Sequence, residues 1–315
     1  MPPAATSAEI VQVSGPLIIG YLLHWGLFGF LSLQTYVYYD AFPNDRLFNK
    51  ALVYTVYLLE LVMTILITHD AFMIFGSGFS NLSSLTEVHF DWLAVPIMGG
   101  LVALIGQTFY SYRVYVVSKS LLIPCVIVII SLTSSVGALI TGVWSLEAGN
   151  ITRLVNHRIS IVVGVWCGAS ALSDIIIAVC MTYYLTKRDT GFRQTHAAVS
   201  KLIRLIIETG SLTAVVALIN LALFVAFPNR VYYTTPGGIL PKLYANAIMV
   251  IFNARIRTVG GRGADMSNGD TMSYRNTAPN TDGGGPSIIA IRREVFSDMD
   301  SHVEMKVMGD AHVSP

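Results

Sequence analysis

At residues 121–146 the chain reads LLIPCVIVIISLTSSVGALITGVWSL, a run without a single Asp, Glu, Lys or Arg. A helix rises about 1.5 Å per residue, so a run of this length crosses the hydrocarbon core of a bilayer, which is about 30 Å thick. Backbone polar groups in lipid must be satisfied within the segment or in a closed barrel, whose strands have only about 10 residues. The run therefore predicts a transmembrane helix.

Apolar runs of comparable length recur on both sides of this one, with short polar segments between them. The 315 residues are 53% hydrophobic and 12% charged, whereas a soluble domain carries about 25% charged residues. We therefore expect an all-α polytopic membrane protein, with seven transmembrane helices in one domain of residues 16–257. The predicted spans are residues 16–39, 52–75, 92–116, 121–146, 159–185, 202–227 and about 236–254.

The Lys and Arg residues near the span ends predict the orientation, because cytoplasmic loops carry the excess of positive charge. With the N-terminus outside, twelve of these residues lie on the cytoplasmic side and three lie outside. We therefore expect residues 1–15 to form a short outer tail and the C-terminus to be cytoplasmic. The cytoplasmic set is Arg46, Lys50, Arg113, Lys119, Lys187, Arg188, Arg193, Lys201, Arg204, Arg255, Arg257 and Arg262, and the outer set is Arg153, Arg158 and Arg230.

Two N-x-S/T acceptor sequences give an independent indication of the same orientation. They begin at Asn81, between the second and third spans, and at Asn150, between the fourth and fifth. Such sequences are glycosylated only on the lumenal side of the membrane. Both lie outside in the predicted topology, so Asn81 and Asn150 are candidate glycosylation sites on a protein of the plasma membrane or another secretory-pathway membrane.

The composition changes near the C-terminus. From Gly260 the chain reads GGRGADMSNGDTMSYRNTAPNTDGGG, which is too polar and rich in glycine to bury a core, so we expect residues 258–315 to form a disordered cytoplasmic tail. The net charge is +1 and no basic block is present, which argues against a nucleic-acid partner. We expect the lipid bilayer as a partner and no cofactor.

Ionisable residues inside the apolar runs are the strongest functional indication, because each costs about 3 kcal/mol at the centre of a membrane helix. Glu60 and Asp174 lie near the middle of their spans, about 15 Å and about 18 Å along the helix from the inner end. We take five residues as a candidate ligand or ion site: Glu60, Asp174, Lys242, His24 and Asn246. For the two carboxylates, hydrogen bonds to polar side chains of neighbouring helices are an equally good explanation.

Lys242 allows three interpretations. Its position about 9 Å inside Pro236 favours a side chain that snorkels to the outer headgroups. The first alternative is a salt bridge to Glu60, Asp174 or Asp70, which would make the bundle interior polar. The second is a Schiff base of the retinal type, which the third span disfavours because its only carboxylate is Asp91, at the outer mouth.

Two further groups of polar residues lie near the membrane surfaces. Arg113, Arg204 and Glu208 are a candidate cytoplasmic switch, although a local pair of Arg204 with Glu208, four residues later, explains the pattern better. On the outer side, imidazole and carboxylate groups of the kind that bind zinc flank the second loop. Their spacing matches no ligand motif, so ordinary interfacial residues are favoured over a metal site; they are His69, Asp70, His89 and Asp91.

Four segments of the sequence resemble a family of uncharacterised fungal, mainly basidiomycete, integral membrane proteins. The resemblance extends over about residues 15–260, is most specific around TGFRQTH and IETG, and implies a seven-helix fold in a membrane with no known activity. The segments are GPLIIGYLLHWGLFGFLSLQTYVYY (15–39), VYLLELVMTILITHDAF (56–72), DIIIAVCMTYYLTKRDTGFRQTHAAVSKLIRLIIETGSLTAVVALINL (174–221) and PKLYANAIMVIFNARIR (241–257).

These observations favour a receptor-like or sensory membrane protein rather than an enzyme. It would take a small ligand from the outer side and act on a cytoplasmic effector through residues 187–204 and the tail. The alternative is a transporter or channel whose path is lined by Glu60, Asp174 and Lys242. A metal-dependent membrane hydrolase is the least favoured of the three.

Overall fold

The computed structural model describes residues 7–78, 89–149, 157–187, 196–227 and 231–256. The chain divides into two compact units, Met1–Arg255 and Ile256–Pro315. The fold and the site described below belong to the first unit. The predicted outer loops with Asn81 and Asn150, much of the 187–204 loop and the tail lie outside the described residues, so those assignments stay predictions.

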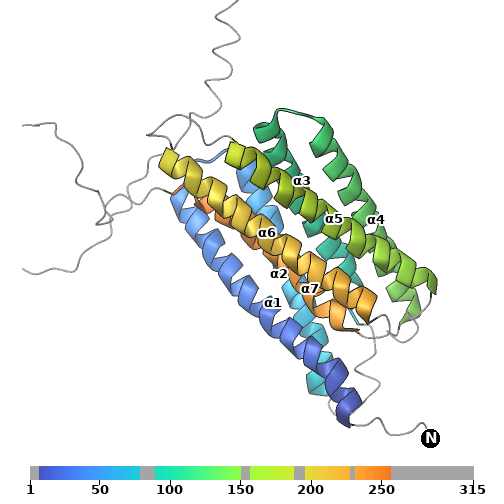
Figure 1. The fold of residues 1–315 in the computed structure, drawn as a ribbon. Coiled ribbons are helices and arrows are strands. Elements are labelled where there is room, and N and C mark those ends of the chain that lie inside the picture. Colours follow the sequence, from blue (N-terminus) through green and yellow to red (C-terminus); the bar gives the residue numbers. More distant parts are fainter. Residues whose placement is uncertain (1–6, 79–88, 150–156, 188–195, 228–230, 257–315) are drawn as a thin grey trace, which may run out of the picture. The chain divides into compact units, whose positions relative to one another are not determined.

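The first unit is all-α, as predicted, and each predicted span overlaps one long helix (Figure 1). Short π-helical turns extend two of the helices, and a 3-10 turn precedes the last. The elements are α1 (Ser7–Ala41), α2 (Leu47–Phe72), η1 (Met73–Ser77), η3 (Leu93–Met98), α3 (Gly99–Ser118), α4 (Leu122–Ala148), α5 (His157–Lys187), α6 (His196–Ala226), η5 (Val231–Tyr233) and α7 (Thr234–Asn253).

Among the residues that the structure describes, six helical segments are long and apolar enough to cross a membrane. Many of their exposed side chains are large and apolar, among them Leu22, Phe30 and Ile129, which fits contact with lipid rather than water. The chain is therefore a multi-pass membrane protein. The segments are Ser14–Ala41, Leu47–Ser77, Leu93–Ser118, Leu122–Ala148, Arg158–Tyr184 and Leu205–Ala226.

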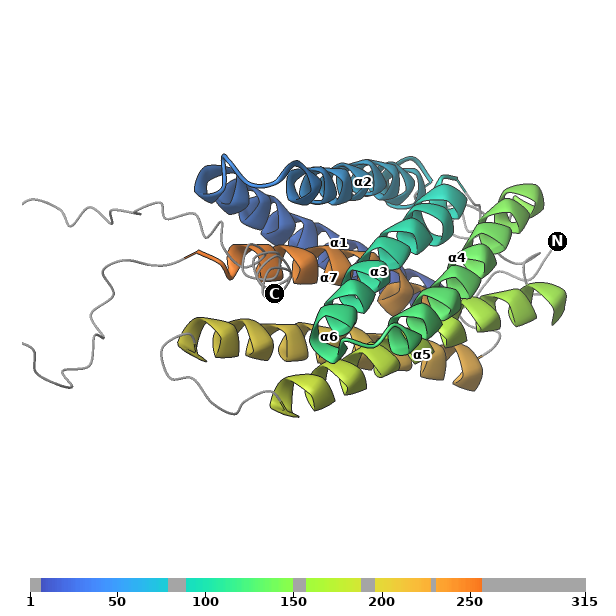
Figure 2. The same cartoon turned by 90° about the horizontal axis from the view of Figure 1, so that it is seen from above.

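Helix α7 packs inside the unit, among four other helices. It contacts α1, α2, α3 and α6, and the view from above places it between the α1–α2 pair and α6 (Figure 2). Most of its side chains are buried, including Lys242, Tyr244 and Met249. Polar side chains that would be costly toward lipid are thereby enclosed by protein.

Glycines allow the close helix contacts that position α7 and its neighbours. A Cβ atom at Gly106 of α3 would lie 3.0 Å from the Cβ of Tyr244, and one at Gly142 of α4 would lie 2.5 Å from Cγ1 of Ile97. Small residues at such contacts let helix backbones approach within a membrane. Gly106 therefore fixes how closely α3 approaches the polar face of α7.

Candidate functional site

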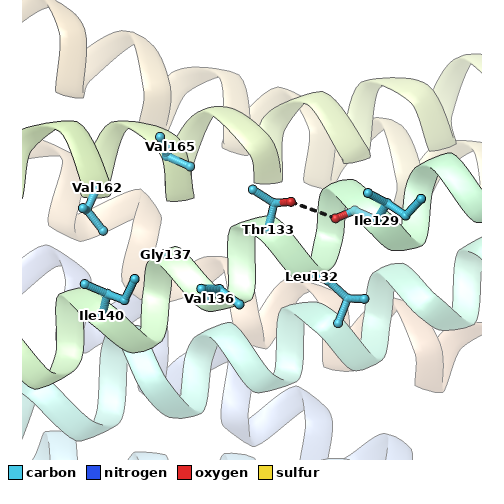
Figure 3. Close-up of a pocket in the computed structure, with 8 residues that line it drawn as sticks. All are labelled: Ile129, Leu132, Thr133, Val136, Gly137, Ile140, Val162 and Val165. Carbon is cyan, nitrogen blue, oxygen red and sulfur yellow. Dashed lines mark hydrogen bonds between the residues drawn. The ribbon is translucent and has the colours of Figure 1, made fainter.

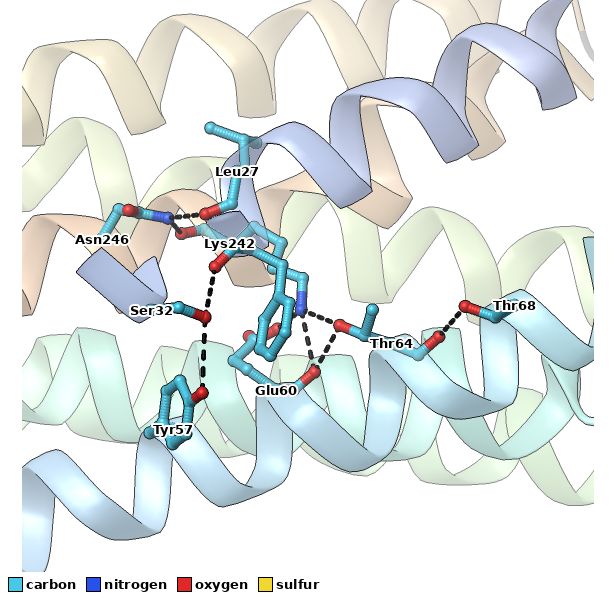
Figure 4. Close-up of polar contacts among 9 residues, drawn as sticks. Leu27, Ser32, Tyr57, Glu60, Thr64, Thr68, Lys242 and Asn246 are labelled. Atoms are coloured by element: carbon cyan, nitrogen blue, oxygen red, sulfur yellow. Dashed lines mark hydrogen bonds and ion pairs between the residues drawn. The ribbon is translucent and has the colours of Figure 1, made fainter. Parts of the chain in front are cut away.

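Lys242 and Glu60 form a fully buried ion pair between α7 and α2 (Figure 4). The Lys242 Nζ lies 2.7 Å from Oε2 of Glu60, and both side chains are 0% exposed. The contact is a charge interaction at short range rather than a well-aligned hydrogen bond. It neutralises two charges that would each be costly alone in a low-dielectric interior.

The remaining partners of the Lys242 ammonium come from α2 and α1. Nζ donates to the backbone oxygen of Glu60 at 2.9 Å and to Oγ1 of Thr64 at 2.6 Å. It also lies 4.6 Å from the ring centroid of Phe28, within the range of a cation–π interaction. Two hydrogen bonds, one ion contact and an aromatic face therefore surround the ammonium.

The snorkelling interpretation of Lys242 is wrong, and the salt-bridge alternative with Glu60 is the one that the structure shows. Position along the helix does not predict where the Lys242 ammonium lies, because α1 and α2 cover the face of α7 from which this side chain projects. The lysine stem therefore meets protein before it can reach the headgroups. The other two proposed partners are engaged elsewhere: Asp70 accepts from the Phe90 N–H, and Asp174 from Tyr244.

Asn246 and His24, the other members of the candidate site, lie at the α1–α7 contact. The Asn246 Nδ2 donates to the Lys242 carbonyl at 2.7 Å and to the Leu27 carbonyl at 3.1 Å, and so ties the two helices together (Figure 4). His24 is 2% exposed, and neither of its ring nitrogens has a hydrogen-bond partner among the described residues. Asn246 therefore lies beside the ion pair and links the backbones of α1 and α7 through its hydrogen bonds.

Asp174 of α5 lies in a second polar cluster, on another face of α7. The Tyr244 hydroxyl donates to Oδ2 of Asp174, and the Gln107 Nε2 donates to Oδ1 at 3.1 Å. Asp174 is 2% exposed, and each hydrogen-bond partner found for it among the described residues is uncharged. The five predicted site residues are therefore divided between two clusters, because Lys242 and Tyr244, two positions apart in α7, project in different directions.

A small cavity adjoins the Asp174 cluster. Its volume is about 20 Å³, enough for about one water molecule. Ser170 and Tyr244 line it together with Asn220, whose Nδ2 contacts Sγ of Cys167 at 3.4 Å and whose Oδ1 has no hydrogen-bond partner in the part of the chain described. Its other lining residues are Val95, Gly99, Ala103, Trp166, Cys167, Gly237, Leu240 and Pro241.

A larger hollow lies between α4 and α5, but its chemistry differs (Figure 3). It is an open groove of about 470 Å³ lined by apolar side chains such as Ile129, Val136 and Val165. Its one hydroxyl, on Thr133, donates to the Ile129 carbonyl. The groove offers shape and apolar surface without groups that orient a ligand, and neither hollow is lined by Lys242.

A third polar cluster joins the end of α7 to the α1–α2 loop. Asp45 accepts hydrogen bonds from Arg255 at 2.5 Å, Tyr38 at 2.8 Å and Asn49 at 3.1 Å. The Arg255 guanidinium also lies 4.5 Å from the ring centroid of Phe42. Burial alone would raise the pKa of Asp45, but the hydrogen bonds from Arg255, Tyr38 and Asn49 outweigh it and hold that pKa well below its usual range.

The structure does not test the proposed cytoplasmic switch. Arg113 lies 5.3 Å from the ring centroid of Phe109, with no hydrogen-bond partner for its Nε among these residues. Glu208 is exposed on α6, and the side chain of Arg204 lies outside the part of the chain that the structure describes. Both the cross-helix pair and the local pair therefore stay predictions.

The four residues of the less favoured metal site lie near one another. His69 Nδ1 is 3.2 Å from Oδ1 of Asp70, and the rings of His69 and His89 have centroids 6.5 Å apart. Burial, together with the charge of Asp70, raises the pKa of Asp91 to about 6. Within the described ranges, no group of three or more His, Cys, Asp and Glu residues is arranged to hold a metal ion.

Sequence reasoning missed Gln107, Tyr244 and the Asp45–Arg255 contact. Gln107 and Tyr244 are uncharged and sit in apolar runs where a polar residue is common, so nothing in their spacing sets them apart. Asp45 lies in a loop, where a carboxylate is ordinary. A count of uncharged donors in the spans could have suggested Gln107 as a partner for Asp174, but not their contact.

The comparisons with known proteins concern the C-terminal half of the bundle. The sequence model described as "Family of unknown function (DUF6534)" matches residues 170–257, less than a third of the chain. No curated protein and no solved structure matches. The matched segment contains Asp174, Lys242 and Tyr244, and it supports an uncharacterised domain over the end of α5, α6 and α7.

Proposed function

We propose that the chain is a receptor-like sensory membrane protein in which α7 is the seventh transmembrane helix. The N-terminus lies outside, and a small ligand binds in the cavity bordered by Ser170, Asn220 and Tyr244. Binding there displaces α7, and the displacement changes how the cytoplasmic end of the bundle meets an effector. Residues 187–204 and the tail contact that effector.

One observation carries the proposal: α7 connects the cavity to a polar contact at its far end. Leu240 and Tyr244 line the cavity, and Arg255 follows the same helix and pairs with Asp45. Fifteen residues from Leu240 to Arg255 correspond to about 22 Å of helix. A rigid helix that borders a small polar cavity at one end and leads to an ion pair at the other fits signal transmission.

A transporter is the second candidate, and the buried carboxylate of Asp174 supports it. Intramembrane carboxylates commonly mark ion or proton paths. The small size of the cavity favours the receptor proposal, because about 20 Å³ holds a head group and not a continuous path.

Hydrogen exchange of the full chain in lipid nanodiscs tests the receptor proposal. Gly237→Val projects into the cavity, since a Cβ there would lie 3.4 Å from Oδ1 of Asn220. Gly238→Val is the matched control, because a Cβ at Gly238 meets nothing within 4 Å. We expect Gly237→Val, but not the control, to change amide exchange at least twofold around residues 42–50 and 250–255.

A change confined to the residues around the cavity, with unchanged exchange at residues 42–50 and 250–255, would contradict the receptor proposal. Proteoliposomes under a pH gradient then test the alternative, because a transporter shows ion flux that Asp174→Asn abolishes.

The effector assignment has its own test. Replacing both Arg193 and Lys201 by Ala should weaken the association of a cytosolic partner, and an unchanged association would argue against the 187–204 loop as its contact.

A further inference from the structure

The side-chain nitrogen of Gln107 sits among four oxygen atoms. Its Nε2 lies 3.1 Å from Oδ1 of Asp174, 3.4 Å from the Tyr244 hydroxyl, and 3.3 and 3.4 Å from the carbonyl and hydroxyl of Ser170. An amide NH₂ has only two hydrogens to donate. The position therefore offers more acceptors than the group that occupies it can use.

These oxygens are of the types that hard cations prefer. A carboxylate, a backbone carbonyl and hydroxyls are the usual oxygen ligands of hard metal ions in proteins. A protonated amine makes use of the same set through its N–H groups. One carboxylate supplies one negative charge, so the site matches a single positive charge.

The charge of Asp174 points in the same direction. Glu60 faces a lysine at 2.7 Å, whereas Asp174 has hydrogen bonds only to the uncharged groups of Tyr244 and Gln107 among the described residues. A buried ion with uncharged partners alone pays a desolvation cost that a cation would offset. The carboxylate thus retains unused affinity for positive charge.

The adjoining cavity supplies both space and a further acceptor. Ser170 and Tyr244 border the cavity as well as the oxygen cluster. Asn220 is 6% exposed, and its Oδ1, without a hydrogen-bond partner among the described residues, belongs to a side chain that lines this cavity. A group larger than a bare ion can extend from the cluster in this direction.

We propose that Asp174, Ser170 and Tyr244 form a binding site for a monovalent cation, which takes the position of the Gln107 amide nitrogen. The cation is Na⁺ or the ammonium head of a small amine. The proposal rests on the proposed function in that the ligand of the adjoining cavity would place its positive charge in this oxygen cluster. Cation binding at Asp174 is nevertheless measurable whether or not the chain signals.

Thermal unfolding of the full chain in nanodiscs tests the site. The probes are NaCl, methylammonium chloride and N-methyl-D-glucamine chloride at equal ionic strength. We expect Na⁺ or methylammonium, but not the bulky glucamine cation, to raise Tm saturably by roughly 3 °C. Asp174→Asn should abolish the rise, whereas Asp91→Asn, a carboxylate outside the cluster, should retain it.

A second variant separates binding from folding. Gln107→Ala removes the amide that competes for the position, so we expect the cation concentration at half-saturation to fall several-fold. Ser170→Ala, which removes one ligand, should raise it. If Gln107 and Ser170 had a purely structural role, both variants would change Tm. The half-saturation concentration would then not fall in one variant and rise in the other.

The outcomes distinguish the sources and the proposals. A response to Na⁺ alone assigns an inorganic ion, and a response to methylammonium alone assigns an amine head group. A folded wild-type chain that responds to neither, or an equal response in Asp174→Asn, would overturn the cation site. Cation binding without altered exchange at residues 250–255 would support the cation site and contradict the receptor proposal. Altered exchange there without cation binding would contradict the cation site and support the receptor proposal.

Discussion

Glu60 and Asp174 are two buried carboxylates at different faces of α7, and they differ in the charge of the groups that contact them. Glu60 is matched by the ammonium of Lys242 at 2.7 Å. Asp174 is held by the hydroxyl of Tyr244 and the amide of Gln107. The first cluster balances its buried charges within the chain, whereas the second leaves a carboxylate without a charged partner among the described residues. We infer that the α2–α7 side fixes the bundle and the α5–α7 side is available for ligand chemistry.

The largest expected effect comes from breaking the ion pair. Lys242→Met leaves Glu60 buried beside apolar groups, and loss of one partner of a buried pair costs about 3–5 kcal/mol. Unfolding in bicelles measures the loss. Lys119→Met, at an exposed lysine, is the matched control and should change stability by less than about 0.5 kcal/mol.

A double variant sharpens this result. Replacing both Lys242 and Glu60 by Met removes both charges, and buried pairs replaced by apolar residues are often close to neutral in stability. We expect the double variant to recover most of the loss of Lys242→Met. Additive losses in the two single variants and the double variant would show that the two side chains do not interact.

On the other side of α7, a smaller effect is expected because Asp174 loses an uncharged hydrogen-bond donor and not a charged partner. Tyr244→Phe removes the hydroxyl that donates to Asp174 and keeps the ring against Gly106. An unsatisfied buried acceptor costs about 1–3 kcal/mol. The same unfolding assay applies, with Tyr112→Phe at an exposed tyrosine as the control. A loss as large as that of Lys242→Met would contradict the difference between the two sides.

The sequence predicted the helices well because the membrane imposes length and apolarity on each segment separately. Run 121–146 is α4 to within two residues. Pairing was predicted less well, since which face of α7 carries Lys242 depends on how α1 and α2 pack against it. The sequence marks Glu60 and Lys242 as costly residues in a membrane, but position along the helix alone favours a snorkelling lysine. Gln107 and Tyr244 are ordinary residues until the fold places them at Asp174.

Asp45 extends the comparison to a carboxylate near the end of the bundle. Its pKa is lowered in the folded protein, so its contribution to stability is present above the unfolded pKa of about 4 and is lost as the pH falls through the folded value. An ion pair with a partly exposed arginine contributes about 0–1 kcal/mol. We expect the stability difference between wild type and Asp45→Asn to stay constant from about pH 7 to about pH 4, and to shrink below.

Unfolding of the two variants across this pH range measures the Asp45 contribution. Glu147→Gln, at an exposed carboxylate of α4, controls for general charge effects. A difference that grows as the pH falls would show that the hydrogen bonds of Asp45 do not favour its ionised form. Such a result would also remove the ion pair of Arg255 as the far contact of α7.

The most direct measurement compares Glu60→Gln with Asp174→Asn in the same unfolding assay. Each change replaces a carboxylate by an amide of similar size. Glu60→Gln leaves the Lys242 ammonium buried without a counter-charge and should cost about 3 kcal/mol or more. Asp174→Asn keeps an oxygen that accepts a hydrogen bond and should cost less than about 1 kcal/mol. Equal losses, or a larger loss for Asp174→Asn, would contradict the account that one side of α7 is fixed by an ion pair and the other is open to a ligand.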